Sequence, residues 1–415
     1  MENARFLYMA GAWSGYNTVA KGQGSWQFGK DGGTGLLPDA KENTMGNPDV
    51  TWEKVAKQNY GIDLKMFDSR LSLTADVFFE KRKDILSTRN TLPAITDINL
   101  PKINLGKVNN HGYELSLGWN DRAGKVDYWL KANVSYAKNK IIYMDEVVPN
   151  EPYMAETGRS TGLTYGYIFD RFLQKDDFDA DGNLKKDENG RQILPQMALG
   201  TPRPGDALFK DLNGDGVING DDKTRFGYAE RPDYVFGFLG GLKWKNFEFS
   251  MQWTAAMNAS RILDGEYRNA FGSTNSRMLL KFLADGRWTE ENPNSRFPRL
   301  TFMNKSHYLQ TSDLWLMNGS YLRLKTAEIS YTFQNKDFLK KKLSVQLSFQ
   351  NPFWKRMKME NTSSDDTFFR RETNYRTMRM LQVSVSYRFG TLKDAIKKVK
   401  RGINNDDVKL SLIHI

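Results

Sequence analysis

The sequence contains no cysteine and only three histidines. The lack of cysteine excludes disulfides, thiol catalysis and cysteine-ligated zinc, and is compatible with an oxidising compartment. His111, His307 and His414 lie far apart, and none belongs to an HExxH motif or sits beside a plausible nucleophile. Acidic residues are plentiful, but no spacing singles out a glycosidase-like pair. We therefore expect a protein that is not an enzyme, and a glycan-active enzyme is the least favoured alternative.

Long apolar runs are also missing. No stretch holds the roughly eighteen consecutive apolar residues that a membrane helix needs, so helical membrane spans are excluded. The mean hydropathy is -0.62, yet 13% of the residues are aromatic. A chain that is polar on average but rich in aromatics is typical of a membrane β-barrel, in which only every second strand residue faces lipid.

Two further absences concern partners and targeting. The net charge is +11, but the basic residues are scattered, apart from residues 393–402, so we expect no nucleic-acid partner. The N-terminus lacks a basic region followed by an apolar core, so the sequence predicts no signal peptide at Met1. The sequence then predicts either a cytosolic protein or an internal fragment of a longer chain.

Apolar and polar residues alternate in many segments, which is the pattern of half-buried strands. These strands appear near ten residues long, which suits a tilted membrane crossing and is about twice the usual length in soluble proteins. The segments are 59–67, 70–81, 112–120, 127–137, 247–253, 342–349 and 381–389. The apolar set would face lipid, and the intervening set would line a polar lumen, as with Gln382, Ser384, Ser386 and Arg388.

Short and long connections alternate between these strands. The short ones are 68–69, 121–125, a turn at Asn246, and 334–341. The long ones are 83–111, 138–234, 258–320 and 351–379. This alternation indicates short periplasmic turns and long extracellular loops. With an extra strand near residues 4–12, we predict an all-β fold: about ten strands of a larger antiparallel transmembrane β-barrel. A soluble β-sandwich is the alternative.

Five stretches resemble one family, the SusC/RagA-type TonB-dependent outer-membrane transporters of the Bacteroidetes. They are GNPDVTWEKVAKQNYGIDL (46–64), INLGKVNNHGYELSLGW (103–119), RPGDALFKDLNGDGVINGDD (203–222), GRWTEENPNSRFPRL (286–300) and LWLMNGSYLRLKTAEISYTF (314–333). The segment from about 342 to 409 looks closer to a related outer-membrane β-barrel family.

The resemblance implies a location in the cell outer membrane and TonB-dependent import of oligosaccharide or peptide nutrients. It also implies a SusD-like surface lipoprotein as partner, outer-membrane lipid around the strands, and a TonB complex acting through a plug upstream of Met1. Residues 1–389 would be the C-terminal part of the barrel. Residues 390–409 would form a basic periplasmic tail that could adopt a helix, and LSLIHI (410–415) is interpreted as a non-native tail.

One motif, DLNGDGVINGDD at 211–222, fits a calcium loop. Gly216 would supply the sharp turn, and the shorter Asp222 in place of glutamate predicts modest affinity. The flanks do not resemble paired helices, so we expect a structural Ca²⁺ in a loop. A turn without metal is the alternative. The predicted ligands are Asp211, Asn213, Asp215, Val217, Asn219 and Asp222. The acidic stretch 176–190 is interpreted as a solvated loop.

Aromatic residues in the segment 258–320 are the candidate substrate contacts, because aromatic rings stack on sugars and peptides. They are Tyr267, Trp288, Tyr308 and Trp315. Packing within the loops is the alternative role for each. For the whole chain, the alternative function is a calcium-stapled extracellular all-β adhesion or binding module.

Overall fold

The computed structural model describes residues 47–91, 101–263, 268–271, 279–302, 306–307, 309–334, 342–356 and 379–388. The strand predicted near residues 4–12 and both tail segments, 390–409 and 410–415, lie outside these ranges. Within the described part, no helix is long and apolar enough to cross a membrane.

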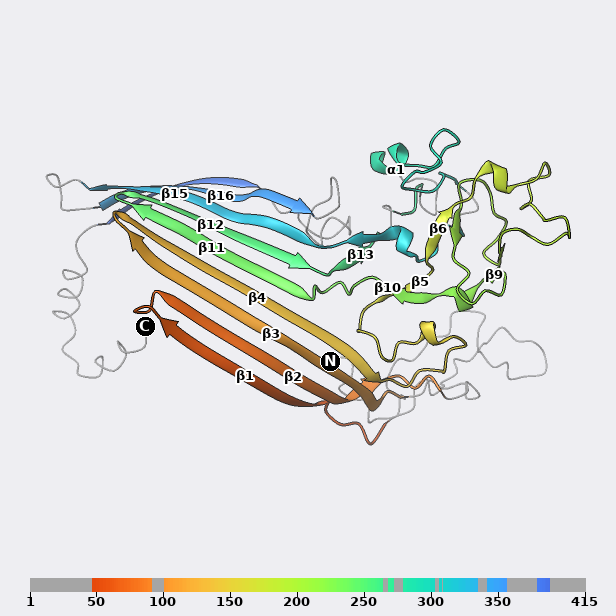
Figure 1. Cartoon of the computed structure of the whole chain (residues 1–415), viewed down its shortest axis with the longest axis horizontal. Helices are drawn as coiled ribbons and strands as arrows, with labels where there is room; N and C mark the ends of the chain where they lie inside the picture. The colour runs from red at the N-terminus through yellow and green to blue at the C-terminus, as the bar shows by residue number, and fades with distance from the viewer. Residues whose placement is uncertain are drawn as a thin grey trace, which may run out of the picture.

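Nine long strands form one continuous antiparallel sheet (Figure 1). In their order across the sheet they are β1 (Lys54–Met66), β2 (Leu71–Ser87), β3 (Ile103–Ala123), β4 (Val126–Tyr143), β11 (Tyr234–Trp244), β12 (Phe247–Met257), β15 (Tyr321–Gln334), β16 (Lys342–Arg356) and β17 (Met380–Arg388). In the described residues β1 and β17 are the two edges, so the sheet is an open part of a barrel.

The strand register brings the apolar positions of neighbouring strands onto one face. One cross-strand row consists of Val77, Tyr113, Tyr136 and Tyr234, and the row two residues further along is Ala75, Leu115, Val134 and Phe236. The other face is polar, with Thr74, Ser116 and Asn133 in one row. Large apolar side chains on the first face are exposed, for example Ile62 at 52% and Val383 at 64%. Such a face needs lipid around it, which confirms the prediction of a partial transmembrane β-barrel.

Several strands are much longer than the predicted ten residues. β2, β3 and β4 contain 17, 21 and 18 residues. The alternation of apolar and polar residues marks only the lipid-crossing part, because beyond it the strands continue with polar and apolar residues that no longer alternate regularly. Three of the connections are correspondingly shorter than predicted and span 88–102, 144–233 and 357–379, whereas the fourth spans 258–320 as predicted.

The short turns lie at one end of the sheet and the long connections at the other (Figure 1). The turn after β1 holds Phe67, Asp68 and Ser69 at positive φ angles of 55°, 55° and 65°. Lys245 has φ 52° in the two-residue turn between β11 and β12. These turns agree with the predicted positions at 68–69, at 121–125 and at Asn246. Most of the predicted turn 334–341 lies outside the described residues.

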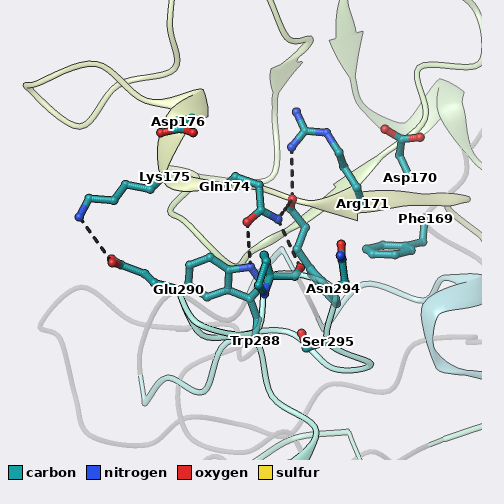
Figure 2. Close-up of a pocket in the computed structure, with 12 residues that line it drawn as sticks. Phe169, Asp170, Arg171, Gln174, Lys175, Asp176, Trp288, Glu290, Asn294 and Ser295 are labelled. Atoms are coloured by element: carbon teal, nitrogen blue, oxygen red, sulfur yellow. Dashed lines mark hydrogen bonds and ion pairs between the residues drawn. The ribbon is translucent and has the colours of Figure 1, made fainter.

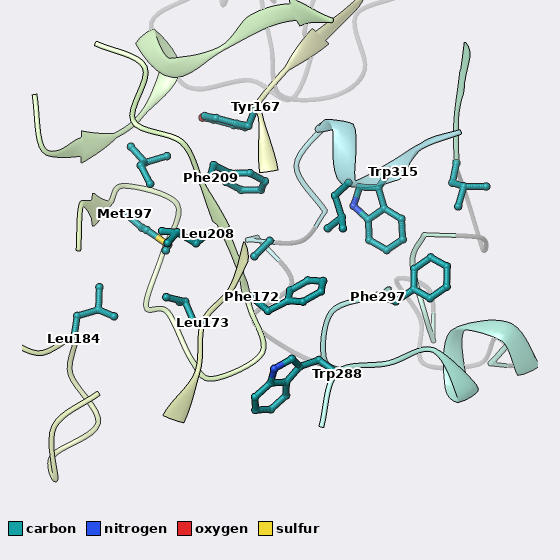
Figure 3. Packing of buried hydrophobic residues seen from close by; sticks show 14 of the residues in the cluster. Tyr167, Phe172, Leu173, Leu184, Met197, Leu208, Phe209, Trp288, Phe297 and Trp315 are labelled. Carbon is teal, nitrogen blue, oxygen red and sulfur yellow. The ribbon is translucent and has the colours of Figure 1, made fainter. Parts of the chain in front are cut away.

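The connections 144–233 and 258–320 fold together into a unit that we call the loop lobe. Its short elements are η3 (Pro152–Met154), β5 (Thr164–Gly166), β6 (Phe169–Phe172), η4 (Lys175–Asp177), β7 (Gln196–Met197), β8 (Ala207–Phe209), β9 (Val217–Ile218), η5 (Gly220–Asp222), β10 (Thr224–Phe226), β13 (Ser260–Ile262), α1 (Lys281–Asp285), η7 (Asp313–Trp315) and β14 (Leu316–Asn318). The lobe has its own hydrophobic core, which includes Tyr167, Phe209, Leu283 and Trp315 (Figure 3). The described residues of these two connections are therefore largely folded rather than structureless.

Candidate functional site

A cavity of about 710 Å³ opens in the loop lobe between its two connections (Figure 2). One wall comes from β6 and η4, and the other from the segment 288–295. The lining residues are Phe169, Asp170, Arg171, Phe172, Gln174, Lys175, Asp176, Trp288, Glu290, Pro293, Asn294 and Ser295. The cavity is thus a mixed surface of aromatic, amide, hydroxyl and charged groups.

A buried ion pair positions the two walls. Asp206 is fully buried, and its carboxylate accepts hydrogen bonds from the Arg299 guanidinium at 2.7 and 3.3 Å. The backbone of Asp206 accepts from the Leu173 N–H at 2.9 Å, at the end of β6. Arg299 in turn lies eleven positions after Trp288 in the second wall. Because a buried carboxylate needs its counter-ion, this pair fixes the two connections against each other.

A second link joins β6 to η7. The Asp313 carboxylate accepts a hydrogen bond of 2.6 Å from the Phe169 N–H. Burial raises the pKa of Asp313 above its usual value, and this hydrogen bond only partly offsets the rise. The Tyr167 N–H also donates to the Thr311 carbonyl at 2.9 Å. The strand that carries Phe169 and Arg171 is therefore held by both connections.

Gln174 bridges the two walls at the cavity itself. Its side-chain oxygen accepts from the Trp288 indole N–H at 3.4 Å, and its amide donates to the carbonyls of Phe172 and Pro293 at 2.9 and 3.4 Å (Figure 2). Lys175 and Glu290 add an exposed ion pair of 3.5 Å. These cross-wall contacts are long, so they orient the walls without closing the cavity.

Arg171 makes the strongest polar contact beside the cavity. Its guanidinium donates two hydrogen bonds to the Asp177 carboxylate, at 2.6 and 2.9 Å. Burial opposes ionisation of Asp177, but the hydrogen bonds from Arg171 and from the Gln174 N–H outweigh it and lower the pKa of the carboxyl. Arg171 is thus already neutralised, and it does not make the cavity an anion site.

The four predicted substrate aromatics have different outcomes. Trp288 lines the cavity, although it is only 8% exposed and also belongs to the core. Trp315 is 1% exposed within the core, so its ring has no free face for a ligand in this structure, and it has the packing role that the sequence left as the alternative. Tyr267 and Tyr308 lie outside the described residues. A substrate role for Trp288 stays a prediction.

The motif 211–222 forms a compact loop closed by its own hydrogen bonds. The Asp211 carboxylate accepts from the N–H groups of Gly214 and Gly216 at 2.7 and 2.8 Å. The Asp222 carboxylate is fully buried and accepts from Leu212 and Asn219 at 2.8 Å each. These hydrogen bonds to Asp211 and Asp222 give the segment 211–222 a closed loop conformation.

Whether a cation fits this loop depends on the oxygen atoms that can still coordinate it besides accepting the hydrogen bonds within the loop. Among the described residues, no three Asp, Glu or His side chains come together as a metal-ligand group. Asp215 accepts from the Val217 N–H at 2.7 Å and from Asn213 at 3.0 Å. Carboxylate oxygens carry further lone pairs, and backbone and amide oxygens can complete a calcium shell. The calcium site therefore stays a prediction.

The same loop anchors the first part of the lobe. The Tyr153 hydroxyl donates to the Asp221 carbonyl at 2.7 Å, and the Asn150 amide donates to the Asp221 carboxylate at 2.9 Å. Burial, together with nearby carboxylates, raises the pKa of Tyr153 to about 12. The Tyr153 hydroxyl thus stays protonated at neutral pH and keeps this contact.

The loop lobe was only partly predictable. No motif marks Phe169, Arg171 or Gln174, and they meet Trp288 and Asn294, which lie in the family-like stretch 286–300, only through the folding of two distant connections. The acidic segment 176–190 was interpreted as a solvated loop, and it forms tight turns in which Asp179 and Asp187 each accept two backbone N–H groups. The one signal in the sequence that could have located the cavity was a cluster of polar residues next to an aromatic residue.

The nine-stranded sheet, with one exposed apolar face and one polar face, defines an outer-membrane β-barrel protein. Comparisons then give the family. The model of the TonB dependent receptor-like β-barrel family matches residues 10–351, and that of an outer-membrane protein β-barrel family matches residues 327–387. The chain belongs to the TonB-dependent receptor-like β-barrel family, and within it the chain is similar to transporters of the SusC/RagA type. The second match agrees with the different character that the sequence showed after residue 342.

Similar proteins support this assignment. The chain is 26% identical to TonB-dependent receptor P3 of Formosa agariphila, over 69% of this chain and 28% of that protein. It is 25% identical to TonB-dependent receptor SusC of Bacteroides thetaiotaomicron, over 70% and 27%. The RagAB peptide importer in its closed-closed state shares the fold, with a TM-score of 0.55 and 21% identity over 76% of this chain and 33% of that chain. The chain thus spans between about a quarter and a third of these relatives.

Proposed function

We propose that the chain forms the C-terminal barrel portion of a TonB-dependent importer of oligosaccharide or peptide nutrients. The observation that carries this proposal is the two-faced sheet, together with the family match over residues 10–351. The apolar face stays in lipid, and the polar face, which includes Thr74, Ser116 and Asn133, lines the route of the nutrient. Import of this kind makes and breaks no bond in the nutrient, so the chain is not an enzyme.

The cavity of the loop lobe is the proposed contact with incoming nutrient. It lies at the end of the sheet that carries the long connections, which is the extracellular end of such a barrel. Trp288 offers an aromatic surface, and Asn294 and Ser295 offer hydrogen-bonding groups that suit either sugar hydroxyls or peptide amides. The lining does not separate the two substrate classes.

Two protein partners follow from the family. A SusD-like surface lipoprotein would contact the loop lobe from outside, and a TonB complex would act on the N-terminal part of the full-length protein. The folded state of the lobe supports the first partner, because a surface with its own core can present a fixed interface. The solved relative RagAB is named a peptide importer, and peptide is therefore one of the two proposed cargoes.

A growth experiment tests the import function. The full-length gene is deleted from its host, and growth is followed on oligosaccharides and on peptides as sole nutrients, with and without TonB. We expect loss of growth on one nutrient class, restored by the gene only when TonB is present. Growth that is unaffected by both deletions on every nutrient would refute the proposal.

A matched pair of variants tests the cavity. Asn294→Trp would fill the cavity, whereas Glu291→Trp would add the same bulk to a neighbouring exposed position that does not line it. We expect uptake by Asn294→Trp to fall at least about fivefold, because even one lost nutrient contact of about 1 kcal/mol has that effect. Glu291→Trp should import normally. Equal uptake by both variants would remove the cavity from the import route.

A calcium-stapled adhesion module remains the second candidate, and the loop 211–222 is the observation in its favour. Fractionation separates the two functions. A heat-modifiable band in the outer-membrane fraction supports the importer. A soluble, monomeric product whose unfolding depends cooperatively on calcium supports the adhesion module.

A further inference from the structure

The lipid-facing side of β1–β4 changes character along the strands. Its mainly apolar rows end at the tyrosine-rich row of Tyr60, Tyr113, Tyr136 and Tyr234, and Phe79 of β2 is the large apolar residue of the next row. Beyond this row, towards the long connections, the same alternation presents basic residues. These are Lys81 and Lys83 on β2 and Lys138 and Lys140 on β4, and we call them the lysine band.

The register places the lysine band close to the tyrosine row. His111 pairs with Lys138 one step beyond Tyr113 and Tyr136, and the next step brings Asn109 between Lys81 and Lys140. Neighbouring strands lie roughly 4.8 Å apart, so Lys81 and Lys140 on either side of β3 are separated by about 10 Å. That distance is within the reach of two flexible lysine side chains to a single anionic group.

The four lysines are exposed and have no ion-pair partner among the described residues. The nearby carboxylates are already occupied. Glu80 pairs with Lys57 at 2.8 Å, and Asp84 pairs with Lys54 at 3.0 Å. Lys83 also lies directly opposite Lys54 in the register, which is an unfavourable pairing of like charges. The described residues thus do not neutralise the charge of this surface.

The position of the lysine band relative to the tyrosine row indicates which layer of the membrane lies against it. Tyrosines gather where a membrane protein passes from hydrocarbon to the headgroup layer, because the ring is apolar and the hydroxyl is polar. The row of Tyr113, Tyr136 and Tyr234 is packed ring against ring, with centroid distances of 5.4 and 4.6 Å. The lysines one to three steps beyond it lie at headgroup level, on the side of the long connections and thus in the outer leaflet.

We propose that the lysine band binds the phosphate-bearing headgroup of an anionic lipid of the outer leaflet. Lysine is an effective point-charge ligand for phosphate, and clustered lysines at a membrane surface attract anionic lipid. The band is continuous with the apolar, lipid-covered part of the same strand faces, so the acyl chains and the headgroup of one lipid meet matching surfaces. The unbalanced positive charge fits phosphate and does not fit a neutral headgroup.

The experiment compares two lipids that differ only in phosphate. The full-length protein is purified in neutral detergent, and binding of bis-phosphorylated lipid A and of fully dephosphorylated lipid A is measured by native mass spectrometry. We expect a preference of at least about tenfold for the phosphorylated form, since each surface lysine contributes about a fivefold factor before screening. No preference in the wild-type protein would overturn the proposal.

Variants locate the site. Lys81→Gln, Lys83→Gln, Lys138→Gln and Lys140→Gln together should abolish the preference. The matched control changes four exposed lysines elsewhere, Lys125→Gln, Lys185→Gln, Lys186→Gln and Lys281→Gln, and should keep it. A preference that survives in the first variant, or is lost equally in the control, refutes the assignment. If the fourfold variant fails to assemble, Lys138→Gln with Lys140→Gln is used, with a several-fold loss expected.

The lipid measurement is independent of import. A protein that imports its nutrient but shows no lipid preference loses only this inference. A protein that shows the preference but supports no TonB-dependent growth loses only the proposed function.

Discussion

Single residues with buried charge hold the loop lobe together. Asp206 and Arg299 form the pair that joins the two long connections, and His307 lies close to both, fully buried. The His307 Nε2 atom contacts the Gly200 carbonyl at 3.0 Å, while its buried Nδ1 atom has no hydrogen-bond partner among the residues that the structure describes. A protonated imidazole would add a poorly satisfied charge here.

His307 should make the lobe sensitive to acid. Burial lowers its pKa below the ordinary 6.5, and the Arg299 charge acts in the same direction. The unfolded lobe therefore takes up this proton at higher pH than the folded lobe, so stability is lost as the pH falls below about 6.5. We expect faster limited proteolysis of the lobe at about pH 5.5 than at about pH 7.5.

His307→Gln is the control for this effect, because glutamine can still donate to the Gly200 carbonyl but cannot titrate. The variant should show a smaller change in proteolysis between the two pH values. Asp313, whose raised pKa gives the opposite sign, is present in both proteins and cancels in the comparison. An identical pH response in both proteins would exclude His307 as the cause.

The calcium prediction also belongs to single residues. If the loop 211–222 binds Ca²⁺, calcium should slow proteolysis of the connection 144–233, with a midpoint of roughly 10⁻⁴–10⁻³ M because the loop ends in aspartate and extracellular calcium modules bind in this range. Asp211→Ala with Asp215→Ala should abolish the protection, whereas Asp181→Ala should retain it. Proteolysis that is unchanged by calcium chelation in the wild-type protein would leave the loop as a turn without metal.

At the scale of the element, the two faces of a strand should respond oppositely to the same substitution. Leu115 lies in the lipid-facing set of β3, between Ala75 and Val134, and the next residue, Ser116, faces the polar side. A lysine at the middle of the lipid face costs about 2–4 kcal/mol. Leu115→Lys should therefore reduce the heat-modifiable, assembled form in membranes, and Ser116→Lys should not. Equal assembly would contradict the assignment of the two faces.

The strand ends illustrate what alternation can and cannot predict. The pattern Tyr113, Leu115, Leu117 and Trp119 correctly gave the lipid face of β3, because lipid contact imposes a period of two. It did not give the extension back to Ile103. That part of β3 lies beyond the lipid-facing rows, where no contact with lipid hydrocarbon imposes a period of two on the sequence.

At the scale of the whole molecule, the described chain has two separate means of stabilisation. The sheet is held by its strand pairing and by lipid, and the lobe by its own apolar core. Phe209 is 1% exposed and stacks on Tyr167 with centroids 4.9 Å apart. Phe209→Ala should destabilise the lobe by about 3–5 kcal/mol.

Because the loop lobe and the sheet are stabilised separately, Phe209→Ala should change a measurement that reports the lobe and not one that reports the barrel. The lobe of Phe209→Ala should become sensitive to protease, while heat-modifiability on a gel, which reports the barrel, should stay as in the wild-type protein. Leu208→Met, which conserves volume in the same core, is the control and should cost less than about 1.5 kcal/mol. Joint loss of both properties would show that lobe and sheet fold as one unit.

The sequence by itself determined the class of this protein, because contact with lipid and the need to pair every backbone group dictate alternation, aromatic borders and short turns within each strand. It also contained the family resemblance and the calcium-like motif. Only the tertiary structure decided which loop residues meet. At the cavity, Gln174 accepts a hydrogen bond from Trp288, and the buried ion pair links Asp206 to Arg299; in both cases the two residues are far apart in the sequence. Contacts between distant segments depend on packing in three dimensions and leave no period in the sequence.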